Sequence, residues 1–178
     1  NALSDIHTAL SFDTKHLSLY HLTLEPNTVF AKYPPPLPTD DESALMQDAI
    51  IELTAEYGYE HYEVSAYAKP GFQAEHNRNY WEFGDYLGIG PGAHSKLSFP
   101  DRILRQSRTR NPEYWMEQAV LRQGSHLAEH KLVDADDLPF EFMLNALRLR
   151  DGVPAEYFEE RTGQALTKIT PTIRKAIE

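Results

Sequence analysis

The chain has 178 residues, of which 41% are hydrophobic and 25% charged, enough for one ordinary domain core or for a larger piece with a smaller one. Its 27 acidic and 17 basic residues give a formal net charge of -10, which disfavours binding of a nucleic-acid backbone because that requires a cationic surface. It has neither the run of about 18 apolar residues that crosses a bilayer nor a signal-peptide pattern at its start, so we expect a cytoplasmic protein without a membrane span.

The sequence contains no cysteine. It therefore offers no disulfide, no cysteine nucleophile and no thiolate ligand for an iron–sulfur cluster. The first residue is not Met, and the chain stops at Ile177 and Glu178, inside a charged run with helical spacing. We therefore expect a fragment of a longer protein.

The first forty residues predict a helix, a strand and a stiff loop. Apolar residues at helical spacing up to Phe12 favour an amphipathic helix followed by a turn. Residues 16–24 are typical of a mostly buried strand, which ends at Pro26 because proline removes a ladder donor. The proline-rich run 33–38 favours a rigid connecting loop over a ligand for a proline-recognition domain.

A capping box begins the next predicted helix. Thr39 can accept a hydrogen bond from the first turn while Glu42 reaches back. Apolar residues then recur at helical spacing as far as Tyr57, and Gly58 can adopt the left-handed conformation that ends the helix. A second strand follows over residues 59–65, so strand, helix and strand form a βαβ unit. We expect an α/β fold with a parallel sheet or part of an α/β barrel.

The character of the sequence changes after about residue 100, where helical patterns dominate. Asn111 and Pro112 favour a helix start, and further helices are expected from Asp134, over residues 154–161 with a stop at Gly163, and from Thr170. The predicted division is an α/β part over residues 1–105 and a helical part over residues 106–178.

One six-residue motif carries most of the candidate binding chemistry. It places an imidazole, two amides, a guanidinium and two aromatic rings together: His76, Asn77, Arg78, Asn79, Tyr80 and Trp81. An imidazole can ligate heme iron, and aromatic faces can pack on a macrocycle. A lone histidine beside aromatic residues is also typical of ordinary hydrogen-bonded structure, so both interpretations stay open at this point.

A glycine-rich run follows over residues 86–95. Its glycines at 88, 90 and 92 let the backbone approach a ligand closely or take a positive φ. The spacing is wrong for the dinucleotide fingerprint, and no Gly-Lys-Ser/Thr of a P-loop is present. A tight turn between a strand and the helical region is the alternative interpretation.

Other candidate residues carry less information. His126 and His130 are spaced as on a metal-binding helix, but no third ligand is evident, so a solvated pair is favoured. Glu63 and Ser65 on one side of a strand could face a barrel lumen or cap a loop. The acidic residues 134–137 favour a helix N-terminus.

The motifs are more specific together than apart. Residues 62–71, the His-Asn-x-x-Tyr-Trp motif at 76–81 and the glycine run at 86–95 resemble the radical-SAM family of oxygen-independent coproporphyrinogen III oxidases, most closely its heme-chaperone branch. Residues 17–26 resemble a preceding barrel strand, and residues 139–153 resemble the start of the family's C-terminal helical domain. Ala66 stands where the family typically has Asn, a small departure.

The resemblance implies a fold and two cofactors. It implies the C-terminal part of a partial (β/α) radical-SAM barrel over residues 1–105, then a truncated, mostly helical accessory domain over 106–178. The family's [4Fe–4S] cluster, which binds S-adenosylmethionine, takes its cysteine ligands from a preceding part of the protein, so this chain alone should be inactive, with no catalytic residue assigned. Thr23, Ala93 and His94 align with positions that line the S-adenosylmethionine site, at strand ends where a barrel places its site.

The resemblance also implies a ligand. His76 would be a heme iron ligand or a partner of a propionate, Tyr80 and Trp81 would pack on the macrocycle, and Arg78 could pair with a propionate. The expected function is a heme-binding chaperone that delivers heme to hemoproteins. The alternative is oxidative decarboxylation of coproporphyrinogen III to protoporphyrinogen IX. An exposed sheet edge would also favour a dimer.

Overall fold

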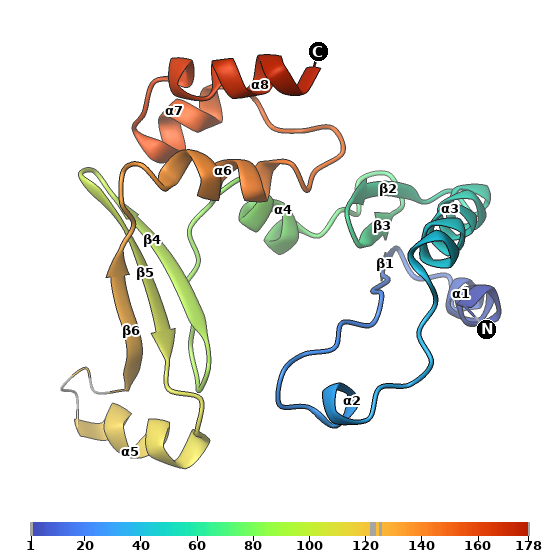
Figure 1. The fold of residues 1–178 in the computed structure, drawn as a ribbon, viewed down its shortest axis with the longest axis horizontal. Coiled ribbons are helices and arrows are strands. Elements are labelled where there is room, and N and C mark those ends of the chain that lie inside the picture. Colours follow the sequence, from blue (N-terminus) through green and yellow to red (C-terminus); the bar gives the residue numbers. More distant parts are fainter. Residues whose placement is uncertain (1, 122–123, 125, 178) are drawn as a thin grey trace. The chain divides into compact units, whose positions relative to one another are not determined.

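The computed structural model describes residues 2–121, 124 and 126–177. The chain divides into two compact units, Asn1–Ala74 and Glu75–Glu178, whose helices and strands are labelled in Figure 1. Each unit has its own apolar cluster. The boundary between these two units falls directly before the His-Asn-x-x-Tyr-Trp motif, and the domain division near residue 105 stays a prediction. Among the described residues, no helix is both long and apolar enough to cross a membrane.

Within the described residues, the first unit contains three helices and a small three-stranded sheet. Its elements in chain order are α1 (Ala2–Ser11), β1 (His16–Ser18), α2 (Val29–Lys32), α3 (Asp40–Glu56), β2 (Glu60–Glu63) and β3 (Ala66–Ala68). The strand order is β1-β3-β2, and both pairings are antiparallel. Of the two predicted arrangements, a parallel sheet and part of an α/β barrel, the parallel sheet is therefore not formed by these paired strands. β1 and β2 run in the same direction, but β3 lies between them because the chain turns back at Val64 and Ser65.

The helix ends of this unit follow the local chemistry of the sequence. The capping box is confirmed: the Thr39 amide donates to Glu42 Oε2 at 2.8 Å and the Glu42 amide donates to Thr39 Oγ1 at 3.3 Å. Gly58 ends α3 with a φ of 79°. The strand predicted over 16–24 is shorter than expected, because Leu22 and Thr23 are exposed and only three residues pair with β3.

The second unit combines a sheet with helices. Its elements are α4 (Glu75–Trp81), β4 (His94–Phe99), β5 (Arg102–Arg108), α5 (Pro112–Leu121), β6 (Leu127–Leu132), α6 (Leu138–Ala146), α7 (Glu156–Thr162), η1 (Leu166–Lys168) and α8 (Thr170–Ile177). The antiparallel sheet β4-β5-β6 was not predicted, and it places His130 on a strand rather than on a helix. The helix start at Asn111 and the stop at Gly163 are confirmed.

Three phenylalanines form the centre of the second core. Phe83, Phe142 and Phe158 are 1–2% exposed. The ring of Phe142 meets Phe83 edge-on at 5.6 Å and Phe158 at 5.3 Å, measured between centroids. Phe142 belongs to α6, Phe158 to α7 and Phe83 to the loop after α4, so this cluster joins the motif helix to the C-terminal helices.

Phe142→Ala should therefore destabilise the second unit strongly. The loss of a buried phenyl ring and the cavity that remains are expected to lower the free energy of unfolding by about 3–5 kcal/mol, measured by urea denaturation. Phe140→Ala is the matched control, because Phe140 lies on the same helix and is 69% exposed. Equal stability of the two variants would contradict this description of the core.

Candidate functional site

The His-Asn-x-x-Tyr-Trp motif forms α4, and its spacing sets which side chains meet. His76 and Tyr80 are four residues apart and so share one face of the helix. Their rings meet edge-on at 6.4 Å, with an angle of 81° between the planes. Both side chains are exposed, and within the described part of the chain no hydrogen bond or ion pair engages the His76 imidazole. The helix thus presents an accessible imidazole beside an aromatic ring.

Trp81 has a different role in the packing. The guanidinium of Arg148 lies 4.2 Å from the centre of its indole ring, a cation–π geometry. The indole Nε1 is buried and has no hydrogen-bond partner among the described residues. Trp81 therefore anchors α4 to the end of α6, while His76 and Tyr80 remain exposed.

Arg78 is engaged within the helix. Its guanidinium forms an ion pair with Glu82 Oε1 at 2.6 Å, four residues further on. Arg78 is half exposed, so the pair contributes little to stability because solvent screens it. A ligand carboxylate would have to compete with Glu82 for this side chain.

A tightly packed turn follows the helix. A Cβ atom at Gly84 would lie 2.0 Å from Asn79 Oδ1, so only glycine fits there. The Asn79 side chain also donates to the Asp85 carbonyl at 2.9 Å. The Tyr86 ring then meets Tyr80 edge-on at 4.7 Å, which continues the aromatic surface of α4 into the next loop.

The buried ammonium of Lys96 fixes this loop. Lys96 is 1% exposed, and its Nζ donates to the Phe83 carbonyl at 2.9 Å and to Asp85 Oδ1 and Ser98 Oγ at 3.0 Å each. Burial lowers the pKa of the Lys96 ammonium, although Asp85 opposes this. Burial alone would raise the pKa of Asp85, but hydrogen bonds from Ser98 and Lys96 outweigh it, so that pKa is lowered. Asp85 is thus ionised at neutral pH and is the counter-ion of Lys96.

The glycine run packs against its own chain. A Cβ atom at Gly88 would lie 2.1 Å from the His94 carbonyl oxygen, and the Gly88 amide donates to Ser95 Oγ at 2.9 Å. The run is therefore a tight turn leading into β4, where Ala93 is half-buried and His94 is exposed. Thr23 lies in the other unit, in the exposed segment after β1, and the S-adenosylmethionine role of these three residues stays a prediction.

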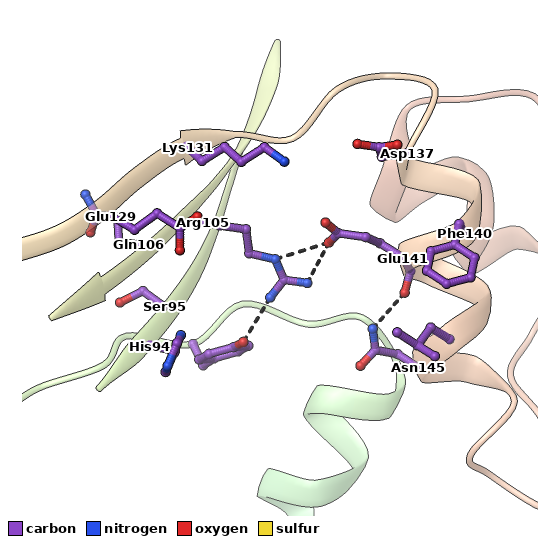
Figure 2. Close-up of a pocket in the computed structure, with 12 residues that line it drawn as sticks. His94, Ser95, Arg105, Gln106, Glu129, Lys131, Asp137, Phe140, Glu141 and Asn145 are labelled. Carbon is purple, nitrogen blue, oxygen red and sulfur yellow. Dashed lines mark hydrogen bonds and ion pairs between the residues drawn. The ribbon is translucent and has the colours of Figure 1, made fainter. Parts of the chain in front are cut away.

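A cavity of about 580 Å³ opens between the sheet and α6. Figure 2 shows His94, Arg105 and Lys131 on the sheet side and Glu141 on the helix side. Arg105 donates through Nε and Nη2 to Glu141 Oε2, at 3.1 and 2.7 Å, and through Nη1 to the Tyr86 hydroxyl at 2.9 Å. Tyr86, which lines the cavity, also contacts Tyr80 of α4, so one aromatic ring lies between the cavity and the helix.

The remaining candidates from the sequence do not gather into a site. No group of three or more potential metal ligands occurs among the described residues. His130 donates or accepts through Nδ1 with Gln106 at 3.1 Å. Glu63 is buried in the first unit, while Ser65 lies in the turn before β3. Asp134 precedes α6, which begins at Leu138.

Comparison with known proteins identifies the class first. The family model described as the HemN C-terminal domain matches residues 133–178. The solved structure of coproporphyrinogen III oxidase (HemN) from Escherichia coli, described as a radical SAM enzyme, matches 96% of this chain and 43% of that chain, with a TM-score of 0.65 and 16% identity. At this identity the match shows a shared fold of helices and sheets alone.

The sequence matches are closer. The chain is 46% identical over 177 residues to a protein named heme chaperone HemW from Escherichia coli (strain K12), covering 99% of this chain and 45% of that protein. It is 45% identical over 178 residues to a protein of the same name from Haemophilus influenzae. A third protein of this name, from Bacillus subtilis, is 31% identical over 176 residues, and the match covers 96% of this chain. Each of these two matches covers 45% of the relative. The chain thus belongs to the coproporphyrinogen III oxidase-like family, in its heme-chaperone branch, as the motifs indicated.

The sequence matches also show how much of its relatives this chain represents. It spans somewhat less than half the length of the curated relatives that it matches. With no cysteine in its sequence, it does not fit an iron–sulfur cluster held by its own thiolates. The exposed imidazole of His76 beside the ring of Tyr80 does fit a porphyrin ligand.

The stabilising effect of the Asp85–Lys96 ion pair on the loop after α4 can be tested by substitution of Asp85. Asp85→Asn should lower the free energy of unfolding at pH 7 by about 1–3 kcal/mol, because the buried ammonium loses its counter-ion. The folded-state pKa of Asp85 lies below its ordinary value of 3.8. Its stabilising effect is therefore present above that value and is lost as the pH falls through the folded pKa, so the difference from wild type should shrink below about pH 4.

The measurement is urea denaturation from pH 7 to pH 3. Asp101→Asn is the matched control, because Asp101 pairs with its neighbour Arg102 on the exposed surface, and it should change stability by less than about 0.5 kcal/mol. If Asp85→Asn were as stable as Asp101→Asn at pH 7, Asp85 would not be the counter-ion described here.

Proposed function

We propose that the protein to which this chain belongs is a heme-binding chaperone that delivers heme to hemoproteins, and that α4 holds the heme. The observation that carries the proposal is the geometry of His76, which is exposed, unengaged within the described part of the chain, and edge-on to Tyr80 at 6.4 Å. The relatives named heme chaperone HemW support the same function.

The residues of α4 have distinct proposed roles. Heme supplies an iron with axial positions that a neutral imidazole can ligate, so His76 is the proposed iron ligand, with a propionate contact as the other possibility. Tyr80 and Trp81 pack on the macrocycle. Since Arg148 occupies one side of the Trp81 ring at 4.2 Å, only the other side of the indole serves this purpose.

The remaining cofactors belong to the whole protein. We propose that residues 1–105 form the C-terminal part of a partial radical-SAM barrel and residues 106–178 part of the helical C-terminal domain. Thr23, Ala93 and His94 would line the S-adenosylmethionine site, and a preceding segment would supply the cysteine ligands of the [4Fe–4S] cluster. The likeness in fold to HemN supports this assignment. A dimer and transfer to acceptor hemoproteins are further parts of the proposal.

Decarboxylation of coproporphyrinogen is the weaker proposal. The oxidase of known structure is only 16% identical to this chain, whereas proteins named heme chaperone HemW reach 46%.

Heme titration of this chain tests the proposal. A saturable shift of the Soret band is expected with the wild-type chain, and His76→Ala should weaken binding by about tenfold or more, equivalent to about 1.4 kcal/mol. His7→Ala is the control, because His7 is an exposed histidine on α1 in the other unit. Unchanged binding by His76→Ala would remove His76 from the site, and absence of any Soret shift would contradict heme binding by these residues.

A further inference from the structure

Three cationic residues form a row across one face of the sheet β4-β5-β6. Lys96 is paired in register with Arg105, and Arg105 with Lys131. Side chains of directly paired residues stand on the same face with Cβ atoms about 4.5–5.5 Å apart. Like charges placed directly opposite each other in this way destabilise a sheet, so an anion beside each cation stabilises the row.

Two members of the row have that compensation. Asp85 lies 3.0 Å from Lys96 Nζ, and Glu141 lies 2.7 Å from the Arg105 guanidinium. Lys131 has none: among the described residues, no ion pair or hydrogen bond engages its ammonium. Glu129 and Asp137 line the same cavity, yet neither approaches Lys131 closely enough to form an ion pair.

We infer that the cavity beside Lys131 is a carboxylate-binding subsite, and that the carboxylate it takes is a propionate of the porphyrin. This inference rests on the proposed function of α4. The ligand carboxylate would be the third anion of the row and would complete the pattern that Asp85 and Glu141 begin. Arg105 contributes as well, because a guanidinium has five N–H donors and three of them are used by Glu141 and Tyr86.

The cavity is linked to α4, the proposed heme-binding helix, through one residue. Tyr86 lies between them: its ring contacts Tyr80 at 4.7 Å, and its hydroxyl accepts a hydrogen bond from Arg105 at 2.9 Å. A macrocycle that packs on Tyr80 would therefore direct a substituent past Tyr86 toward Arg105 and Lys131. The Glu141 ion pair holds the guanidinium in one position, which reduces the conformational entropy lost when a ligand binds.

The size and lining of the cavity agree with a substituent of this kind. Its volume of about 580 Å³ lies within the range of small-molecule sites, about 300–1,000 Å³. Its walls combine the rings of Tyr86 and Phe140 and the apolar Leu144 with the cations of Arg105 and Lys131. Figure 2 shows Phe140 on the helix side and the two cations on the sheet side. A pyrrole edge would lie against the apolar residues and its propionate against the cationic row.

The test compares heme with heme dimethyl ester, which keeps the macrocycle and the iron but has no free carboxylate. Both are titrated into the wild-type chain, Lys131→Gln and Lys168→Gln. Lys168 is the control because it is an exposed lysine of the same unit, outside this cavity. Lys131 is also exposed, so its substitution should preserve the fold, which circular dichroism verifies.

The wild-type chain should bind the ester about three- to tenfold more weakly than heme. Lys131→Gln should reduce heme affinity toward that of the ester and leave ester affinity unchanged, while Lys168→Gln should change neither. Equal affinity of the wild-type chain for heme and ester, or equal weakening of both by Lys131→Gln, would overturn the subsite and leave heme binding at α4 intact. Binding of neither compound by the wild-type chain would instead overturn the proposed function.

Discussion

The second unit depends on the burial of one ammonium group. Lys96 enters the interior from β4, where its charge must be compensated, and the compensation comes from the loop that follows α4. The backbone of that loop is therefore held against the sheet, with Tyr86 and Lys96 exchanging two backbone hydrogen bonds of 3.0 Å. The position of Tyr86, in contact with Tyr80 and lining the cavity, follows from this constraint. A buried lysine here serves to position a loop.

The proposed binding region is built from elements that are distant in sequence. α4 contributes the imidazole and the aromatic rings, the sheet contributes the cationic row, and α6 contributes Glu141 and, just beyond its end, Arg148. Besides the phenylalanine cluster, two charged contacts link these elements: the cation–π contact of Arg148 with Trp81 and the ion pair of Arg105 with Glu141. Since residues 133–178 match the HemN C-terminal domain, both links connect that domain to the rest of the unit.

The sequence predicts what short-range chemistry determines. The capping box at Thr39, the stop at Gly58 and the helix start at Asn111 depend on residues within a few positions, and the structure confirms them. The sheet β4-β5-β6 was not predicted from the sequence. Ser95 and Lys96 are polar but buried, so β4 lacks the alternation of apolar and polar residues that is typical of a half-buried strand. The hairpin of β2 and β3 was not predicted because its turn, Val64 and Ser65, contains no Gly, Pro, Asn or Asp.

The proposed binding region, too, could be predicted from the sequence only where its residues are close together in the chain. The motif at 76–81 points to the proposed binding helix, since a compact cluster of distinctive side chains is visible in the sequence. Arg105 and Glu141 gave no such signal, because their pairing joins residues 36 positions apart and depends on how the chain folds.

Both tryptophans of the chain belong to the second unit, and Trp81 is part of the motif helix itself. An indole held rigidly under a guanidinium is an intrinsic fluorophore at a fixed place, and heme absorbs strongly where indole emits. A heme bound on α4 would quench Trp81 by energy transfer. The fold thus contains its own optical reporter of occupancy, with no label to attach.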